Sequence, residues 1–269
     1  MVVVNREFSQ HLERTEARAN ADFVDTRARL EPDSGAAWIE VGGAFAMYDG
    51  AESPLTQTFG LGIFEDIKSE YLDEIESFYR EHDAPVFHEI SPLTDQSHMT
   101  MLSERGYRPV ELTTVMFREL GGVVAKRERN ADLRTRVIEP EEVETWARTS
   151  ADAWASEHEA FGEFMFKFGS ISAQCEGSFP YIVELAGEPI AAAMLLIYDD
   201  VCILAGAATL PRARRLGAQT ALLEDRLTKA AASGCKFAIL GAAPGSQSQL
   251  NAQKNEFQIA YTRTKWMLT

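Results

Sequence analysis

The chain has few of the features that mark membrane, metal-binding or secreted proteins. Its 269 residues include only three cysteines and five histidines, and no pair of these stands at metal-ligand spacing. Cys175, Cys202 and Cys235 are odd in number and lack a CxxC spacing, so we expect buried, reduced thiols. No apolar run approaches the roughly 20 residues that span a bilayer. Charge follows residues 1–4 too soon for a secretory signal. We therefore expect a cytoplasmic protein without a metal or a membrane partner.

Positive charge is also scarce. Lysine and arginine number 26 against 41 aspartates and glutamates, which gives a net charge of −15. Such a surface repels a phosphate backbone, so nucleic acid is excluded as a partner. It attracts cationic amines weakly, although a need for solubility explains it equally well. One segment departs from this pattern, because basic residues crowd between positions 212 and 236: Arg212, Arg214, Arg215, Arg226, Lys229 and Lys236.

Hydrophobic periodicity predicts two halves that both mix helices and strands. In the first half we expect helices at 8–30, 68–82 and 95–105, strands at 37–47, at 85–90 and at 108–120, and one further strand that ends near 61–64. In the second half we expect strands at 134–138, 181–185, 190–198, 201–210, 236–240 and 257–268. Helices are expected from 139 and at 160–169, 217–233 and 246–255. Both halves end as strand, helix, strand, helix, strand. We interpret this as a duplication, with domains at 1–122 and 133–269 and a linker at 123–132.

The clearest functional signal is the strand-to-helix junction at residues 209–223. The first amides of a helix have no carbonyl partner within it, so they can bind an anion. Gly217 places no Cβ in the way of an approaching phosphate, and Arg214 and Arg215 can add charge-assisted hydrogen bonds. The spacing alone is more typical of an ordinary strand-to-helix turn that carries surface arginines.

The junction and the order of strands around it resemble the GCN5-related N-acetyltransferase (GNAT) superfamily. The signature of that superfamily is Gln/Arg-x-x-Gly-x-Gly/Ala; Arg214 and Gly217 fill the first two positions, and Gln219 departs from the third. Residues 244–252 also resemble a bacterial subset with tandem domains. The resemblance implies an α/β fold with two GNAT-like domains, each a mixed, mostly antiparallel sheet flanked by helices. Either a monomer or a homodimer fits it.

The resemblance further implies acetyl-CoA as the cosubstrate. The pantetheine arm would lie against a bulged strand that Gly206 and its small neighbours suit, although close packing of a helix on the sheet explains small residues too. A backbone amide near Ala207 would stabilise the oxyanion. The residues implied along the coenzyme are Ala207, Ala208, Thr209, Leu210, Arg214, Arg215, Leu216, Gly217, Ala218, Gln219, Thr220 and Asn251. For Asn251, a place on a helix surface is the competing explanation.

Catalysis requires a base, because a primary amine is mostly protonated at neutral pH. Glu184 is the preferred candidate, directly or through water, although a surface carboxylate on an alternating strand explains it too. Glu157, His158 and Glu159 are rivals. The tyrosine that many members use to protonate the leaving thiolate would fall at Ala252, so it is absent. Tyr261 and Ser248 are possible substitutes, and a thiol with a pKa near that of cysteine, about 8.5, can also leave unaided.

The corresponding junction of the first half, at 60–68, has no arginine, and Glu65 and Asp66 would repel a pyrophosphate. We expect no coenzyme there, and therefore a degenerate domain. The sequence as a whole predicts an N-acetyltransferase that acts on a primary amine of a small molecule or peptide. The alternative is a non-catalytic acyl-CoA-binding protein with a regulatory or scaffold role.

Overall fold

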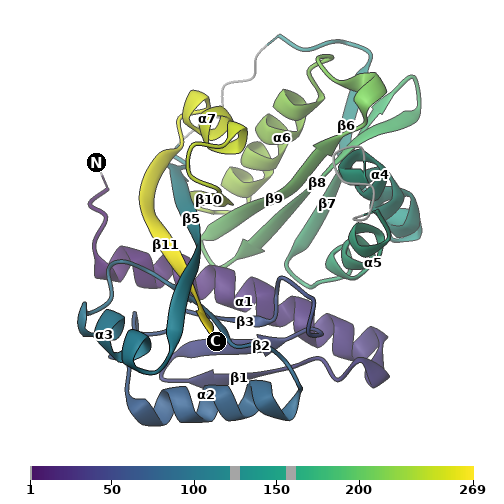
Figure 1. Cartoon of the computed structure of the whole chain (residues 1–269). Helices are drawn as coiled ribbons and strands as arrows, with labels where there is room; N and C mark the ends of the chain where they lie inside the picture. Colours follow the sequence, from purple (N-terminus) through teal and green to yellow (C-terminus); the bar gives the residue numbers. More distant parts are fainter. Residues whose placement is uncertain (1, 122–127, 156–161) are drawn as a thin grey trace. The chain divides into compact units, whose positions relative to one another are not determined.

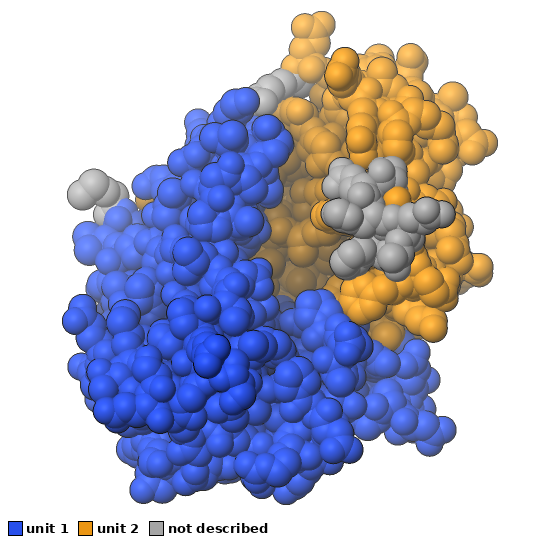
Figure 2. All heavy atoms as spheres, viewed as in Figure 1, with its two compact units in different colours: residues 1–118, 239–269 blue, residues 119–238 orange. Residues whose placement is uncertain are grey.

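The structure is a computed structural model that describes residues 2–121, 128–155 and 162–269 (Figure 1). The chain forms two compact units, one of residues 1–118 with 239–269 and one of residues 119–238 (Figure 2). Both units contain helices and strands, which confirms the predicted α/β class. Over the ranges given above, none of the helices is both long enough and apolar enough to cross a membrane.

The first unit is built on a mixed sheet in the order β1-β2-β3-β4-β11-β5. Its strands are β1 (Ala37–Val41), β2 (Ala44–Tyr48), β3 (Gln57–Phe59), β4 (Phe87–Ile90), β5 (Tyr107–Glu119) and β11 (Gln258–Leu268). Only the β3–β4 pair is parallel among those with a described register. The helices are α1 (Arg6–Leu30), α2 (Ser69–Glu81), α3 (Ser97–Glu104) and α7 (Gln247–Lys254). Its core includes an apolar cluster around α2 and another beside α1.

The single strand expected at 37–47 is wrong, because the structure has a hairpin there. Gly42 and Gly43 lie between β1 and β2 with φ values of 56° and 80°. Two consecutive residues with positive φ form the tight turn whose twist matches that of antiparallel strands. Glycine adopts this conformation without strain. The Gly-Gly pair therefore indicated the turn, which the hydrophobic periodicity alone did not.

The second unit has an antiparallel sheet in the order β9-β8-β7-β6. Its strands are β6 (Leu133–Val137), β7 (Ser178–Leu185), β8 (Glu188–Tyr198) and β9 (Val201–Thr209), and its helices are α4 (Val143–Ala155), α5 (Gly162–Ser172) and α6 (Ala218–Ala232). Trp146 of α4 packs on Ile182 and Met194 on one face of the sheet. The hydroxyl of Tyr181, the neighbour of Ile182 in β7, points to the carbonyl of Asp225 in α6 at 3.5 Å. The two helices therefore cover opposite faces (Figure 1).

The compact units divide the chain differently from the domains expected at 1–122 and 133–269. Residues 239–269 cluster with the first unit, because β11 pairs antiparallel with both β4 and β5. The strand β10 (Phe237–Ala242) crosses the boundary between the units. Of the expected linker, residues 123–127 lie outside the described residues, while Arg129 binds Glu224 and Asp225 of α6. The duplication itself stays a prediction.

Candidate functional site

The strand β9 contains a bulge at the glycine that the sequence singled out. Its register against β8 shifts between Ala192 and Met194, so that one residue of β8 faces two of β9, Gly206 and Ala207. Gly206 has a φ of 60°, in the left-handed region that favours glycine. The bulge predicted in this strand is confirmed.

The bulge is also where β9 is least covered. Val201–Leu204 and Ala208 are buried, whereas Ala205 and Ala207 are half-buried and Gly206 is exposed. A Cβ built on Gly206 would meet no atom within 4 Å. The competing explanation, that a helix packs too closely for a side chain, therefore does not apply to Gly206. The glycine serves the backbone conformation.

The side chain of Arg226, on α6, reaches this bulge from the face of the sheet that α6 covers. Its side chain is 3% exposed. Nη1 donates hydrogen bonds to the carbonyls of Met194 at 2.9 Å and Ala205 at 3.4 Å, while Nε donates to the carbonyl of Leu222 at 3.1 Å. Burial lowers the pKa of Arg226 to about 10, which still leaves it charged at neutral pH.

Arg226 is one of the six basic residues that crowd between positions 212 and 236 in the sequence, and the structure buries its side chain. Ala218, Leu222, Arg226 and Ala230 recur every four residues, and all four are buried. The spacing of four residues on one helix face thus indicated that position 226 is buried. The pattern was not recognised because an arginine, which is charged, interrupts the apolar residues.

The turn after β9 has an unusual backbone. Arg214 is extended, with φ −64° and ψ 151°, Arg215 is left-handed at φ 67°, and Gly217 is left-handed at φ 93°. Arg214, Arg215, Leu216 and Gly217 are all exposed. Left-handed residues in such a turn direct successive amides to one side and form anion-binding concavities.

The N-terminus of α6 follows directly and has no side-chain cap. Gly217 is the N-cap residue, and its carbonyl accepts the first intrahelical bond, from the amide of Ala221 at 3.0 Å. The amides of residues 218–220 precede that bond. With the helix dipole, they make this end attractive to an anion.

Gln219 and Thr209 join the helix to the strand. The Gln219 amide donates to the Thr209 hydroxyl at 2.8 Å, so the side chain turns toward β9. This contact gives the departure from the GNAT signature a structural role. Thr209, Leu210 and Ala218 are buried, whereas Thr220 is half-buried.

Glu184 lies on β7, where it already has a cationic partner. Arg136 of β6 donates to its carboxylate at 2.5 Å and also binds Glu142. An amine substrate would have to compete with Arg136 for this carboxylate. The rivals Glu157, His158 and Glu159 lie outside the described residues.

The remaining candidates, Tyr261, Ser248 and Asn251, belong to the first unit. Ser248 and Asn251 are exposed on α7, and Gln247 donates to the Asn251 side chain at 2.8 Å. Tyr261 of β11 is buried and donates to Glu13 of α1 at 2.8 Å. Burial raises the pKa of Tyr261 well above its ordinary value. Its hydroxyl is therefore a poor proton donor in this setting.

A buried ionic cluster surrounds that hydroxyl. Arg263 of β11 is 2% exposed and lies within 3.3 Å of Glu13 and 2.8 Å of Glu16. Glu89 of β4 is 3.5 Å from Arg263. Burial outweighs the attraction of Arg263 and raises the pKa of Glu13 to about 7.

The junction at 60–68 in the first unit is occupied by protein groups. Arg6 of α1 donates to the carbonyls of Gly62 at 3.1 Å and Ile63 at 3.0 Å, and it pairs with Asp66. A bulkier residue at Gly62 would clash with Ile67. The absence of a coenzyme here stays a prediction.

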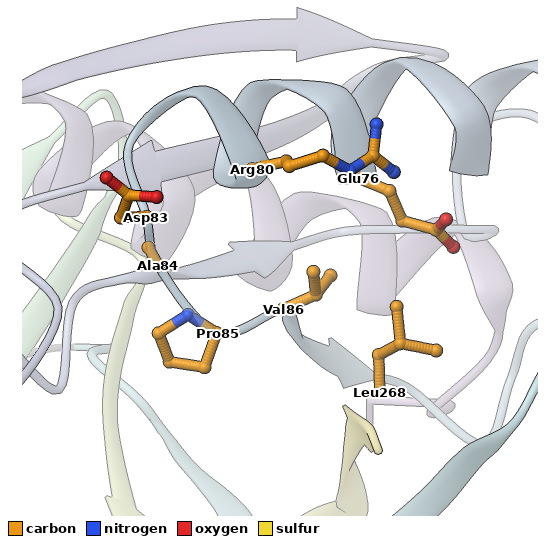
Figure 3. Close-up of a pocket in the computed structure, with 7 residues that line it drawn as sticks. All are labelled: Glu76, Arg80, Asp83, Ala84, Pro85, Val86 and Leu268. Atoms are coloured by element: carbon orange, nitrogen blue, oxygen red, sulfur yellow. The ribbon is translucent and has the colours of Figure 1, made fainter.

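A shallow pocket of about 400 Å³ lies in the first unit beside the end of α2 (Figure 3). Its lining is Glu76, Arg80, Asp83, Ala84, Pro85, Val86 and Leu268. Glu76 already accepts hydrogen bonds from Arg105 at 2.6 Å and from Tyr107 at 2.8 Å. We assign no ligand to this pocket. In the part of the chain that the structure describes, no group of three or more His, Cys, Asp and Glu side chains could hold a metal ion.

Comparison with known proteins connects the bulge and the turn to one family. Residues 116–245 match the family model described as an acetyltransferase (GNAT) domain. The chain contains a GNAT acetyltransferase domain. No curated protein matches the chain.

Solved structures share the fold over most of the chain. A GCN5-related N-acetyltransferase from Kribbella flavida is 18% identical, with a TM-score of 0.63 and coverage of 93% of this chain and 94% of that one. A tandem GNAT protein from the clavulanic acid biosynthesis pathway is 11% identical, with a TM-score of 0.55 and coverage of 94% and 95%. A GCN5-related N-acetyltransferase from Sphaerobacter thermophilus is 13% identical, with a TM-score of 0.55 and coverage of 78% and 71%. These likenesses show a GNAT fold, and one of these neighbours is a tandem GNAT protein.

The matched GNAT segment contains Glu184, the bulge and the Arg-x-x-Gly turn, whereas Ser248, Asn251 and Tyr261 follow it. The sequence-predicted residues on β9 and at the start of α6 therefore lie together within the matched segment, and those of the turn, residues 214–217, are exposed.

Proposed function

We propose that the protein is a cytoplasmic N-acetyltransferase that transfers an acetyl group from acetyl-CoA to a primary amine of a small molecule or peptide. One observation supports this above the others. The bulged strand β9 leads directly into an exposed turn with two arginines and an uncapped helix N-terminus, all within the segment that matches the GNAT family.

In this proposal the pyrophosphate of the coenzyme binds the amides of residues 218–220 and the side chains of Arg214 and Arg215. The pantetheine arm follows the backbone of residues 207–210, starting at the bulge, where Gly206 is exposed and Ala207 is half-buried. Asn251 is our candidate for a further contact with that arm. The first 122 residues would form a degenerate GNAT-like domain without a coenzyme.

The reaction would proceed by direct attack. The neutral amine nitrogen forms a bond to the thioester carbonyl carbon, and the resulting oxyanion is stabilised by an amide near Ala207. Glu184 accepts the amine proton, directly or through water. Collapse of the intermediate breaks the C–S bond and releases the coenzyme A thiolate, which takes a proton from Ser248 or solvent, because the buried Tyr261 hydroxyl is held by Glu13.

A second candidate function is non-catalytic binding of acyl-CoA. Two contacts favour it: Arg136 holds the Glu184 carboxylate, and Glu13 holds the Tyr261 hydroxyl. Ala252, at the position where many GNAT enzymes have a catalytic tyrosine, also favours it.

Turnover decides between the two. The full chain is incubated with acetyl-CoA and a panel of primary amines, while free thiol and acetylated product are measured. We expect turnover with at least one amine, and a higher KM for acetyl-CoA when Arg214 and Arg215 are both replaced by glutamine. Saturable binding without turnover would establish the second candidate, and the absence of binding would reject both.

A further inference from the structure

The bulge in β9 creates a hydrogen-bonding problem that one side chain solves. Where two residues of a strand face one, the regular ladder is interrupted and backbone groups lose their partners. An unpaired carbonyl in the interior is costly. Here Met194 and Ala205, the first pair beyond the bulge, each direct a carbonyl to Nη1 of Arg226.

The partners of Arg226 make its role specific. All three of its described hydrogen bonds go to backbone carbonyls, and none goes to a carboxylate. A buried cation without a counter-ion is expensive, and an apolar side chain would suit the buried face of α6 better. We therefore explain the arginine at this position by the bulged shape of β9, whose carbonyls it binds, and not by a gain in stability.

We propose that Arg226 is a positioning residue of the coenzyme site, which holds the β9 bulge in the form that receives the pantetheine arm of acyl-CoA. This inference rests on the proposed function. Nη1 bridges the Met194 carbonyl of β8 and the Ala205 carbonyl of β9 beside the register shift, while Nε donates to the Leu222 carbonyl of α6, so one planar group ties the helix to both strands. A lysine has a single ammonium group and cannot make the strand contacts and the helix contact with separate nitrogens.

The test compares two ligands on three full-length variants. Acetyl-CoA contains the pantetheine arm, whereas 3′-phosphoadenosine 5′-diphosphate has the pyrophosphate without it. The variants are Arg226→Met, Arg226→Lys and, as a matched control, Lys229→Met, which removes a cation from the same helix. Lys229 lies over the ring of Phe179 at 4.8 Å. Titration calorimetry gives each Kd, and thermal unfolding shows that each variant is folded.

We expect both Arg226 variants to bind acetyl-CoA at least about tenfold more weakly and the nucleotide fragment within about twofold of the wild type. The control should bind both ligands normally. Equal losses for both ligands would overturn the inference, as would no loss for either. If Arg226→Met does not fold, the test depends on Arg226→Lys, which keeps the positive charge and the aliphatic stem. If neither folds, Arg226 serves the stability of the whole unit and the inference is wrong. A wild type that binds neither ligand would instead reject the proposed function.

Discussion

Replacing Tyr261 by phenylalanine separates a structural role for this residue from a catalytic one. The substitution keeps the aromatic ring and removes only the hydroxyl, which donates to the Glu13 carboxylate at 2.8 Å. Both residues are buried, at 6% and 1% exposure, so water cannot replace the lost donor. Arg263 stays as the other partner of Glu13, at 3.3 Å.

The expected magnitude follows from this geometry. A buried hydrogen bond to a charged group contributes about 1.5–3 kcal/mol, and the apolar area of the ring is unchanged, so we expect a loss of about 2 kcal/mol. The pKa of Glu13 is about 7, and the bond to Tyr261 lowers it. The loss should therefore be larger at about pH 8.5, where Glu13 is charged, than at about pH 5.5, where it is neutral.

Urea unfolding at both pH values measures the stability of the full chain, and steady-state acetyl transfer measures the folded enzyme. We expect kcat within about twofold of the wild type, because Glu13 holds the hydroxyl and burial makes it a weak acid. A fall in kcat of about a hundredfold with unchanged stability would refute this reasoning and identify Tyr261 as the catalytic acid.

Three further predictions concern single side chains. Glu13→Gln should flatten the dependence of stability on pH. Because burial raises the pKa of Glu13 from 4.5 to about 7, the wild type should lose up to about 3 kcal/mol relative to this variant as pH rises through that interval; equal slopes in urea unfolding would contradict this. Glu184→Gln should lower kcat about a hundredfold without changing the KM for acetyl-CoA, whereas an unchanged kcat would exclude Glu184 as the base. Gly206→Ala should cost about 1 kcal/mol of stability because of its left-handed backbone, and Gly206→Asn should cost less; an alanine variant as stable as the wild type would show that no strain exists.

The sequence, with the family resemblance that implied the bulge, predicted features that depend on local backbone conformation. The bulge at Gly206 and the turn at Gly217 both depend on backbone conformations that glycine adopts readily, and both are present. The helix α6 begins within one residue of its expected start at 217 and ends within one residue of its expected end at 233. Such features are encoded by neighbouring residues, so a single sequence reveals them.

Features that depend on distant residues were not accessible in the same way. The pairing of β11 with β4 and β5 joins segments more than a hundred residues apart, and alternation alone cannot specify a partner. The burial of Arg226 was missed because arginine is normally exposed. In the structure its guanidinium donates hydrogen bonds to backbone carbonyls of two strands. The contact of Tyr261 with Glu13 likewise joins opposite ends of the chain.

The central claim is that the N-terminus of α6 binds the pyrophosphate of acetyl-CoA. Gly217→Glu tests it by placing a carboxylate there, and Gly234→Glu is the matched control. Gly234 follows the other end of α6 with a φ of 88°, close to the 93° of Gly217, and a Cβ there meets no atom within 4 Å. The control thus adds the same charge and a similar backbone strain at the opposite end of the helix.

Titration calorimetry of acetyl-CoA into the wild type and both variants, each shown to be folded, is the most direct measurement. We predict saturable binding of one acetyl-CoA per chain in the wild type and in Gly234→Glu, and its loss in Gly217→Glu. Unchanged binding in Gly217→Glu, or no binding in the wild type, would contradict the claim.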